Sequence, residues 1–413
     1  MQQHPIDQTT VRGAGLGNDE PRRGTRRLRY SWPAVVCVVG ALTGALAPAT
    51  AGAVTLPTIP GVQLPSIPAV PLPPGAKPWW SYLLPGGAAT TTPTAGTPTP
   101  APTPAPAPAT PGSLPGKAFS GTYTTSAGSL TYTGYVPSTY KAGTAMPLVV
   151  SLHGCTETAD VFRQLTRWDQ LAEAKGFIVV FPEQSKSNNN MNCWNFFQQA
   201  HMARDKGEPS LIAGITQWVQ QHYTVDSKRI YVNGLSAGGA MSSVMAATYP
   251  DLYAAAGIGS GCEYAATAAC AGYKSADPTQ AAQQAYQAMG QHARRMPVIL
   301  FEGDQDTTVP PVNAQQIVQQ WQLTDDMADD GVKNGSIPVQ PTSVTHGTSP
   351  GGQAYTVTSY SDGGPGDELL QSWLVSGMGH AWSGGCSCEQ YADPAGPDET
   401  GAMYAFFMAH PMP

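Results

Sequence analysis

The sequence lacks the basic stripe, interleaved with aromatic residues, that is typical of a nucleic-acid-binding surface. The chain holds 21 Lys+Arg against 28 Asp+Glu, a formal net charge of −7. The first 53 residues carry 6 of the basic and 3 of the acidic residues, so the remainder carries 15 and 25, a net charge near −10. An acidic chain is repelled by nucleic acid and by anionic membranes, and we expect neither as a partner.

The sequence also lacks an apolar run that would cross a bilayer comfortably. The run at 32–47 is about 15 residues long and contains Pro33, whereas a spanning helix needs about 20. It follows five arginines between 22 and 29 and precedes small residues at 49–53. This order is typical of a secretory signal peptide. We expect residues 1–53 to direct export and the protein to be secreted, the alternative being a retained membrane anchor.

Charge is nearly absent from residues 54–116, where Lys77 is the only charged side chain. The segment is rich in Pro, Ala and Thr, a composition that buries no core and favours extended polyproline II structure. It therefore predicts a disordered, semi-rigid linker. Trp79 and Trp80 interrupt it. They would contact a cell wall or polymer surface, unless they pack against the folded domain or have no role.

Cysteine pairs with metal-binding spacing are missing, since no Cys-x2-Cys has a matching partner pair. Seven cysteines are present, and one lies in the leader. The other six are Cys155, Cys193, Cys262, Cys270, Cys386 and Cys388. An even number in an exported chain indicates disulfides. Cys262 and Cys270 would close a short loop, and Cys155 with Cys193 is the next pairing expected. A bridge between the last two, one residue apart, would be strained.

Metal ligands of other kinds are not evident either. Acidic residues gather at Asp325, Asp326, Asp329 and Asp330, but their spacing matches no standard calcium loop, and we expect a solvated loop there. We therefore expect no metal and no cofactor.

Residues 117–413 alternate strand-like and helix-like segments, which predicts one α/β domain. Strands are expected at 122–125, 130–136, 147–152, 177–181, 230–233, 254–258, 298–301, 355–360 and 368–375, and helices at 161–175, 209–222, 237–249, 281–294, 313–323 and 400–409. This alternation implies a mainly parallel sheet with helices on both faces. Chemistry then gathers at the carboxyl ends of the strands.

A nucleophile elbow is predicted by the sequence Gly-Leu-Ser-Ala-Gly at 234–238, which lies between an expected strand and an expected helix. In such an elbow the serine hydroxyl projects above the sheet, and Gly234 and Gly238 allow the strand and the helix to approach closely. Ser236 is the expected nucleophile. The alternative is an ordinary glycine-rich turn.

The other members of a catalytic triad follow in the order acid, then histidine. The acid lies in the loop after the strand at 298–301, where Asp306 is preferred and Asp304 would brace the turn. The base is His380, between glycines after the strand at 368–375. His346, in a polar loop, and His410, at the end of the last helix, are expected to be surface residues.

An oxyanion hole is predicted from His153-Gly-Cys155, which follows a buried strand. The donors would be the backbone N–H groups of Cys155 and of Ala237, the residue after the nucleophile. We expect His153 to be a structural ring that fixes this loop.

Six motifs in this order together resemble the polyhydroxybutyrate depolymerase family of secreted serine esterases, which is related to feruloyl and acetylxylan esterases. They are His153-Gly-Cys155, Cys193-Trp-Asn195, Gly207-Glu-Pro209, the elbow through Met241, Gly-Asp-x-Asp-x-x-Val at 303–309 and His380-Ala-Trp-Ser-Gly-Gly385. The likeness extends over about residues 118–410.

The resemblance implies an α/β-hydrolase fold and a triad of Ser236, Asp306 and His380. It supports the pairing of Cys155 with Cys193. It also places Trp194 and Trp382 near the substrate, with core packing as the alternative.

The expected function is therefore hydrolysis of carboxylic esters through an acyl-enzyme, on hydroxyalkanoate polyester, oligomers or related short-chain esters. Polymer-degrading members usually carry a further substrate-binding domain, whereas this sequence ends soon after its last expected helix. The alternatives are a feruloyl or acetylxylan esterase acting on plant polysaccharide, and a non-catalytic wall-binding protein. Intact Ser, Asp and His in order argue against the last of these.

Overall fold

The computed structural model describes residues 114–271, 277–362 and 368–413. The leader expected at 1–53 lies outside this part, and so does the linker expected at 54–116 except for its last three residues. The surface contact predicted for Trp79 and Trp80 therefore stays a prediction. Among the helices in the described ranges, none has the length and hydropathy of a membrane-spanning segment.

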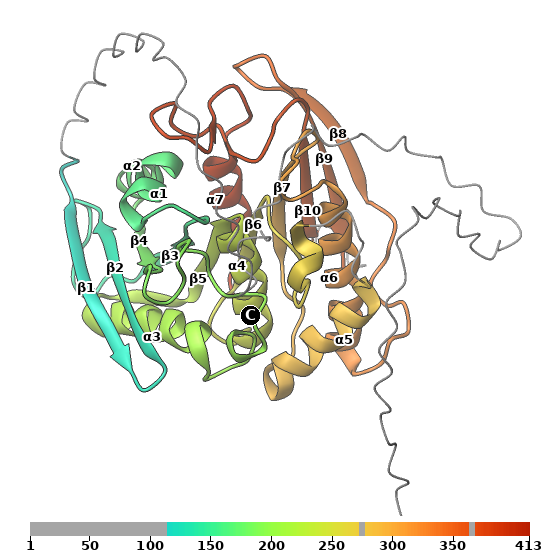
Figure 1. Ribbon diagram of the computed structural model, residues 1–413, viewed down its shortest axis with the longest axis horizontal. Helices are drawn as coiled ribbons and strands as arrows, with labels where there is room; N and C mark the ends of the chain where they lie inside the picture. Colours follow the sequence, from blue (N-terminus) through green and yellow to red (C-terminus); the bar gives the residue numbers. More distant parts are fainter. Residues whose placement is uncertain (1–113, 272–276, 363–367) are drawn as a thin grey trace, which may run out of the picture. The chain divides into compact units, whose positions relative to one another are not determined.

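A ten-stranded sheet forms the centre of the fold (Figure 1). Its strands, from one edge to the other, are β1 (Lys117–Thr125), β2 (Gly128–Val136), β4 (Ile178–Glu183), β3 (Met146–Leu152), β5 (Val225–Leu235), β6 (Ala255–Gly259), β7 (Val298–Gly303), β10 (Glu368–Val375), β9 (Ala354–Ser361) and β8 (Ser343–Thr348).

The six strands from β4 to β10 run parallel to one another. At one edge β1 is antiparallel to β2 and β2 to β4, and at the other β9 is antiparallel to β10 and β8 to β9. Every residue of β3 and of β6 is buried, as expected for strands covered on both faces. The prediction of a mainly parallel sheet is confirmed. The expected strands at 122–125 and 130–136 form an antiparallel hairpin at one edge, and further antiparallel strands lie at the other edge.

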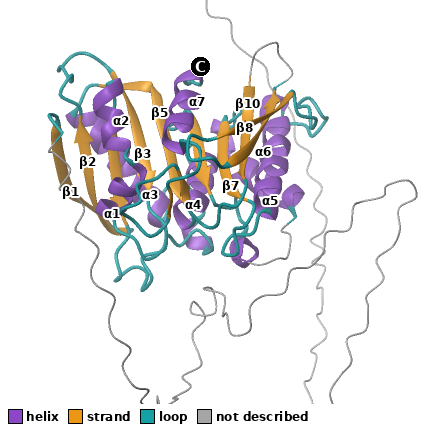
Figure 2. Ribbon diagram, turned by 90° about the horizontal axis from the view of Figure 1, so that it is seen from above, coloured by secondary structure: helices purple, strands orange, loops and turns teal. Residues whose placement is uncertain are grey.

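Helices cover both faces of the sheet (Figure 2). One core packs α1 (Ala159–Thr166), α2 (Trp168–Lys175) and α7 (Glu399–Ala409) on the sheet, and the other packs α3 (Gly207–His222), α4 (Ala237–Thr248), α5 (Pro278–Met289) and α6 (Val312–Asp330). Short elements complete the described part: β11 (Trp382–Ser383), β12 (Ala392–Asp393) and the 3-10 helices Gln199–His201, Thr267–Ala271 and Gly290–His292.

The single helix expected at 161–175 is two helices. Arg167 adopts a left-handed conformation with φ 56, caps α1 through its N–H and directly precedes α2. Both helices bury aromatic rings, Phe162 and Trp168, in the same core. The apolar pattern therefore continues across the break, and the periodicity of the sequence does not reveal it.

The solvated loop expected around the four acidic residues between 325 and 330 is wrong. These residues form the last turns of α6, where Asp325 and Asp326 are buried. Asp325 accepts the N–H of Met296 at 2.8 Å, and Asp326 accepts the hydroxyl of Ser336 at 2.9 Å. Hydrogen-bond donors from other segments of the chain thus allow these acidic side chains at the end of the helix to be buried. In the described ranges, three or more potential metal ligands do not gather anywhere.

The polar loop expected around His346 is also wrong, because this residue lies on the edge strand β8. Its Nδ1 is 3.0 Å from the hydroxyl oxygen of Thr356 on β9. All six residues of β8 are at least partly exposed. Because β8 has no buried face, its sequence shows no alternation of apolar and polar residues, and hydrophobic periodicity does not predict the strand.

Candidate active site

Ser236 lies in the tight turn between β5 and α4, with φ 58 and ψ −120, a backbone conformation that L residues rarely adopt. Its N–H donates to the carbonyl of Gly259 at 2.8 Å. A Cβ on Gly238 would lie 2.0 Å from the carbonyl oxygen of Leu152, and one on Gly234 would lie 2.5 Å from it. Glycine is therefore required on both sides of the serine. Strain of this kind gathers at functional sites.

His380 and Asp306 are in contact through Nδ1 and Oδ2, which are 2.6 Å apart. The other carboxylate oxygen accepts the N–H groups of Thr308 at 2.7 Å and Val309 at 2.8 Å. The Asp306 carboxylate is fully buried, whereas 11% of the His380 side chain is exposed. The carboxylate is thus fixed on both sides and holds the Nδ1 proton, which leaves Nε2 as the basic atom of the ring.

The Ser236 hydroxyl has no hydrogen-bond partner among the described residues. In ligand-free structures, catalytic hydrogen bonds are often long and form fully only in the substrate complex.

Asp304, the rival acid, braces the loop that carries His380. Its Oδ1 accepts the N–H of Gly377 at 2.7 Å, and its Oδ2 accepts the hydroxyl of Ser376 at 3.0 Å. These two residues come just after β10 and begin the turn that leads to the histidine. Of the two neighbouring aspartates, Asp306 contacts the imidazole and Asp304 holds the loop.

The loop after β3 lies directly beside the elbow. A Cβ on Gly154 would be 3.5 Å from the Cβ of Ser236. Cys155 is bonded to Cys193 in a disulfide. In the described part of the chain, the N–H groups of Cys155 and Ala237 have no protein acceptor. Both predicted oxyanion donors therefore belong to segments packed against the serine and remain free to bind a ligand.

His153 and Glu157 hold this loop from beneath. The buried His153 accepts the N–H of Gln184 on Nε2 at 3.0 Å, so Nδ1 carries the proton and donates to the carbonyl of Gly154 at 2.7 Å. Burial lowers its pKa to about 4. Glu157 accepts the N–H of Gly154 at 2.7 Å, and burial raises its pKa to about 7. The structural role expected for His153 fits these contacts, whereas Glu157 was not singled out from the sequence.

Trp194 and Trp382 are fully buried, so neither ring presents a face to solvent. The Trp194 N–H donates to the carbonyl of His153 at 3.0 Å. The Trp382 N–H donates to the hydroxyl of Thr400 at 2.9 Å, and its ring packs edge-on against Phe162. The core-packing alternative describes both residues. Trp194 thus packs against the loop at Gly154, and Trp382 anchors the segment after His380 in the core.

Two buried glutamates near the acid were also missed. Glu302, in β7, is buried, and its pKa is raised well above the usual range by burial and then by the charge of Asp306. Glu399, the first residue of α7, accepts the N–H of Ser383 at 2.8 Å, and burial raises its pKa as well. A single glutamate in a sequence carries no signal of such burial, because its neighbours come from other elements.

The remaining cysteines are bonded as Cys262–Cys270 and Cys386–Cys388. The second bridge is the one expected to be strained, because a single residue separates its cysteines. The N–H of Cys386 also donates to the carbonyl of Leu165 in α1, at 2.9 Å, which ties the segment after the His380 loop to the body of the domain.

The esterase PHB depolymerase family model matches residues 130–335. Acetylxylan esterase A of Emericella nidulans is 32% identical over 260 residues, which are 60% of this chain and 78% of that protein. The chain belongs to the polyhydroxybutyrate depolymerase family of esterases.

Poly(3-hydroxyalkanoate) depolymerase C of Paucimonas lemoignei is 33% identical to this family member over 266 residues, which are 62% of this chain and 59% of that protein. The chain therefore spans less than two thirds of the depolymerase. An acetyl xylan esterase structure from Aspergillus awamori superposes with a TM-score of 0.51 at 28% identity, covering 61% of this chain and 89% of that one. The expected α/β-hydrolase fold is confirmed.

Proposed function

We propose that the protein hydrolyses carboxylic esters through an acyl-enzyme on Ser236. The observation that carries the proposal is the 2.6 Å contact between His380 Nδ1 and the buried carboxylate of Asp306. It orients the imidazole and stabilises its charged form, so that Nε2 serves as general base. The strained elbow supplies a half-buried serine at the carboxyl edge of the sheet.

In the proposed mechanism, Ser236 Oγ attacks the ester carbonyl carbon and His380 Nε2 takes the hydroxyl proton. The N–H groups of Cys155 and Ala237 bind the oxyanion of the tetrahedral intermediate. Collapse breaks the bond to the alcohol, which takes the proton from Nε2. A water molecule, deprotonated by His380, then attacks the acyl-enzyme and releases the carboxylic acid.

The proposed substrates are hydroxyalkanoate oligomers, polyester or related short-chain esters, as the depolymerase among the relatives suggests. A second candidate is an acetyl ester on a polysaccharide. It is favoured by the similarity to the Emericella nidulans acetylxylan esterase, which is 32% identical over 260 residues.

We infer that the protein is exported. The apolar segment at 32–47 after its arginines supports this, and so do the three disulfides of the described part, because disulfides persist in oxidising compartments.

Clearing of an amorphous polyhydroxybutyrate suspension, beside hydrolysis of a soluble butyrate ester, tests the function. Ser236→Ala should lower the rate on the soluble ester on the order of 10⁴-fold or more. Clearing by the parent would identify a polyester depolymerase, and soluble-ester hydrolysis without clearing would favour acetyl esters and oligomers. Equal rates in parent and variant would exclude Ser236 as the nucleophile.

A further inference from the structure

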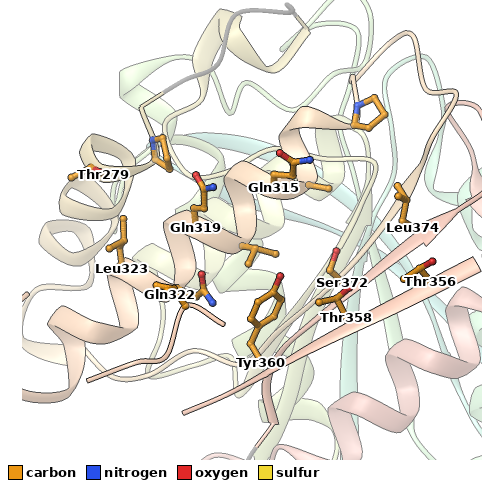
Figure 3. A pocket seen from close by; sticks show the side chains of 15 residues that line it. Thr279, Gln315, Gln319, Gln322, Leu323, Thr356, Thr358, Tyr360, Ser372 and Leu374 are labelled. Atoms are coloured by element: carbon orange, nitrogen blue, oxygen red, sulfur yellow. The ribbon is translucent and has the colours of Figure 1, made fainter. Parts of the chain in front are cut away.

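A groove of about 660 Å³ lies between helices α5 and α6 and the strands β9 and β10 (Figure 3). One wall is a side of α6 on which Gln315 and Gln319 are exposed, and the other is a face of the antiparallel edge of the sheet. Its lining residues are Pro278, Thr279, Pro311, Ala314, Gln315, Val318, Gln319, Gln322, Leu323, Val339, Thr356, Thr358, Tyr360, Ser372 and Leu374. None of the residues used in the proposed ester hydrolysis is among them.

The two walls carry polar side chains at regular intervals. Gln315, Gln319 and Gln322 recur every three or four residues on α6, which places them about 5–6 Å apart along the helix. Thr358 and Tyr360 alternate on β9, about 7 Å apart. Figure 3 shows the amides and hydroxyls of the two rows on opposite sides of the groove. Such rows fit an extended ligand with repeating polar groups.

Most of these polar groups lack a partner in the protein. Among the described residues, the side chains of Gln315, Gln319, Thr358, Tyr360 and Ser372 make no hydrogen bond to another protein group. Amides and hydroxyls both donate and accept hydrogen bonds. The groove therefore presents both donors and acceptors, and a ligand whose own groups both donate and accept hydrogen bonds would satisfy them.

The groove also carries no ionic charge, although the chain beyond the leader has a net charge near −10. The lining contains no Asp, Glu, Lys, Arg or His among the described residues. Between the polar rows it offers apolar side chains such as Val318, Leu323 and Leu374. A charged ligand would lose its hydration without an ionic partner there. A neutral ligand with polar edges and apolar faces would find both surfaces matched.

We infer that this groove binds a neutral polysaccharide chain. Each hydroxyl of such a chain donates and accepts, as the amides and hydroxyls of the groove do, and its sugar rings offer apolar faces to the aliphatic side chains. An aliphatic polyester offers acceptors along its length but no donors, so it would pair with the amide N–H groups of Gln315 and Gln319 and not with their oxygens. The chemistry of the lining therefore favours the polysaccharide.

The position of the groove suits a site that holds polymer next to the catalytic loops. Pro311 follows the Asp306 loop by a few residues. Leu374 directly precedes Val375, whose carbonyl accepts the N–H of Asp304. One end of the groove thus lies at the carboxyl edge of the sheet, where the proposed catalytic residues are found. Binding in the groove does not depend on ester hydrolysis.

The test measures binding of the full chain carrying Ser236→Ala to insoluble neutral xylan, by depletion from solution, with polyhydroxybutyrate granules as the comparison surface. Gln315→Ala with Gln319→Ala, in the same chain, removes two exposed amides. Alanine has a high helix propensity, so α6 should remain intact. The matched control is Gln170→Ala with Gln283→Ala, which removes two exposed glutamines outside the groove. Because all variants keep the linker, any contribution from Trp79 and Trp80 is the same in each.

The groove variant should bind xylan about tenfold more weakly, the loss expected for two or so hydrogen bonds, while the control binds like the parent. With Ser236 present, hydrolysis of a soluble ester should be equal in parent, groove variant and control. Equal xylan binding in all three proteins, no binding to xylan, or binding to polyester granules alone would overturn the inference. Because soluble-ester activity is measured separately, these outcomes leave the proposed hydrolysis standing, and a failure of hydrolysis leaves the binding result intact.

Discussion

The two loops of the proposed active site are held in different ways. The loop at Gly154 and Cys155 is fixed by a disulfide and by uncharged or desolvated buried groups, namely His153 and Glu157. The loop that carries His380 is fixed by two aspartates, one on the imidazole and one on the turn before it. We infer that a covalent bond helps to position the oxyanion donor at Cys155, whereas only hydrogen bonds to carboxylates position the base.

This difference suits what each loop has to do in the proposed mechanism. Oxyanion donors stabilise the transition state only if they already point at the developing charge, so rigidity is an advantage. The base accepts and returns a proton, and a carboxylate beside it stabilises the charged ring in between. Substitutions that remove a charge should therefore act on the His380 loop, and substitutions that remove the bridge should act on the oxyanion loop.

Asp306→Asn should have the largest effect on activity. The amide preserves the size of the side chain, but it can donate a hydrogen bond to Nδ1 and so favour the wrong imidazole tautomer. We expect kcat to fall on the order of 10⁴-fold with a soluble ester, and the melting temperature to change little by comparison. Asp304→Asn is the matched control, since the neighbouring aspartate does not touch the ring. A loss of similar size in both variants would contradict the assignment of roles.

Removal of the Cys155–Cys193 bridge by two Cys→Ser substitutions should have the next largest effect. The bridge spans 38 residues, and its loss should lower the free energy of unfolding by about 2–4 kcal/mol. Because the donor loop is then less ordered, kcat should fall about tenfold. Urea unfolding and steady-state kinetics measure the two effects. The control is Cys386→Ser with Cys388→Ser. That bridge has a sequence separation of 2, so its loss should change the unfolding free energy and kcat much less. Equal losses would contradict a special role for the first bridge.

Glu157→Gln should change the pH dependence of stability. Burial raises the pKa of Glu157 to about 7 from 4.5, so between these values the folded protein holds a proton that the unfolded chain has lost. This group therefore lowers the stability as the pH rises from 4.5 through about 7. Glutamine does not titrate and retains an acceptor for Gly154. The loss of unfolding free energy between pH 5 and pH 8 should be smaller in the variant, by about 1–3 kcal/mol.

Denaturant unfolding of parent and Glu157→Gln at pH 5 and pH 8 measures this difference. Parallel losses of stability in the two proteins would contradict the burial of an ionisable acid in the oxyanion loop. Activity on a soluble ester should stay within a few-fold of the parent, because the glutamine oxygen still accepts the Gly154 N–H.

Asp304→Asn should have the smallest effect. It weakens two hydrogen bonds at an exposed turn, which is expected to lower the unfolding free energy by about 1 kcal/mol and kcat only a few-fold. A shift of the pH–rate profile should be absent, since Asp304 does not contact the imidazole. A displaced profile would mean that this aspartate also acts on the base.

Much of the fold was predictable because most elements carry a strong local signal. The elbow at Ser236, the buried strand β3 and the order of motifs along the chain all lie within short segments. The choice between Asp304 and Asp306 rested on loop position, and the structure brings Asp306 to His380. The break at Arg167 was missed because the apolar pattern runs on through it.

The supports of the site were less predictable, because they join segments far apart in the sequence. Trp194 was expected near the substrate from a family motif, yet its N–H is bonded to His153 and its ring is buried. Glu157, Glu302 and Glu399 resemble ordinary surface residues in the sequence. Their burial follows only from tertiary packing, which a single sequence does not display.

Mass spectrometry of the protein after reaction with a serine-directed fluorophosphonate tests the proposed triad most directly. We expect one covalent adduct on the peptide that contains Ser236, formed at least about a hundredfold more slowly in His380→Ala and at an unchanged rate in His346→Ala. An adduct on another residue, or equally fast labelling in parent and His380→Ala, would contradict a catalytic triad of Ser236, Asp306 and His380.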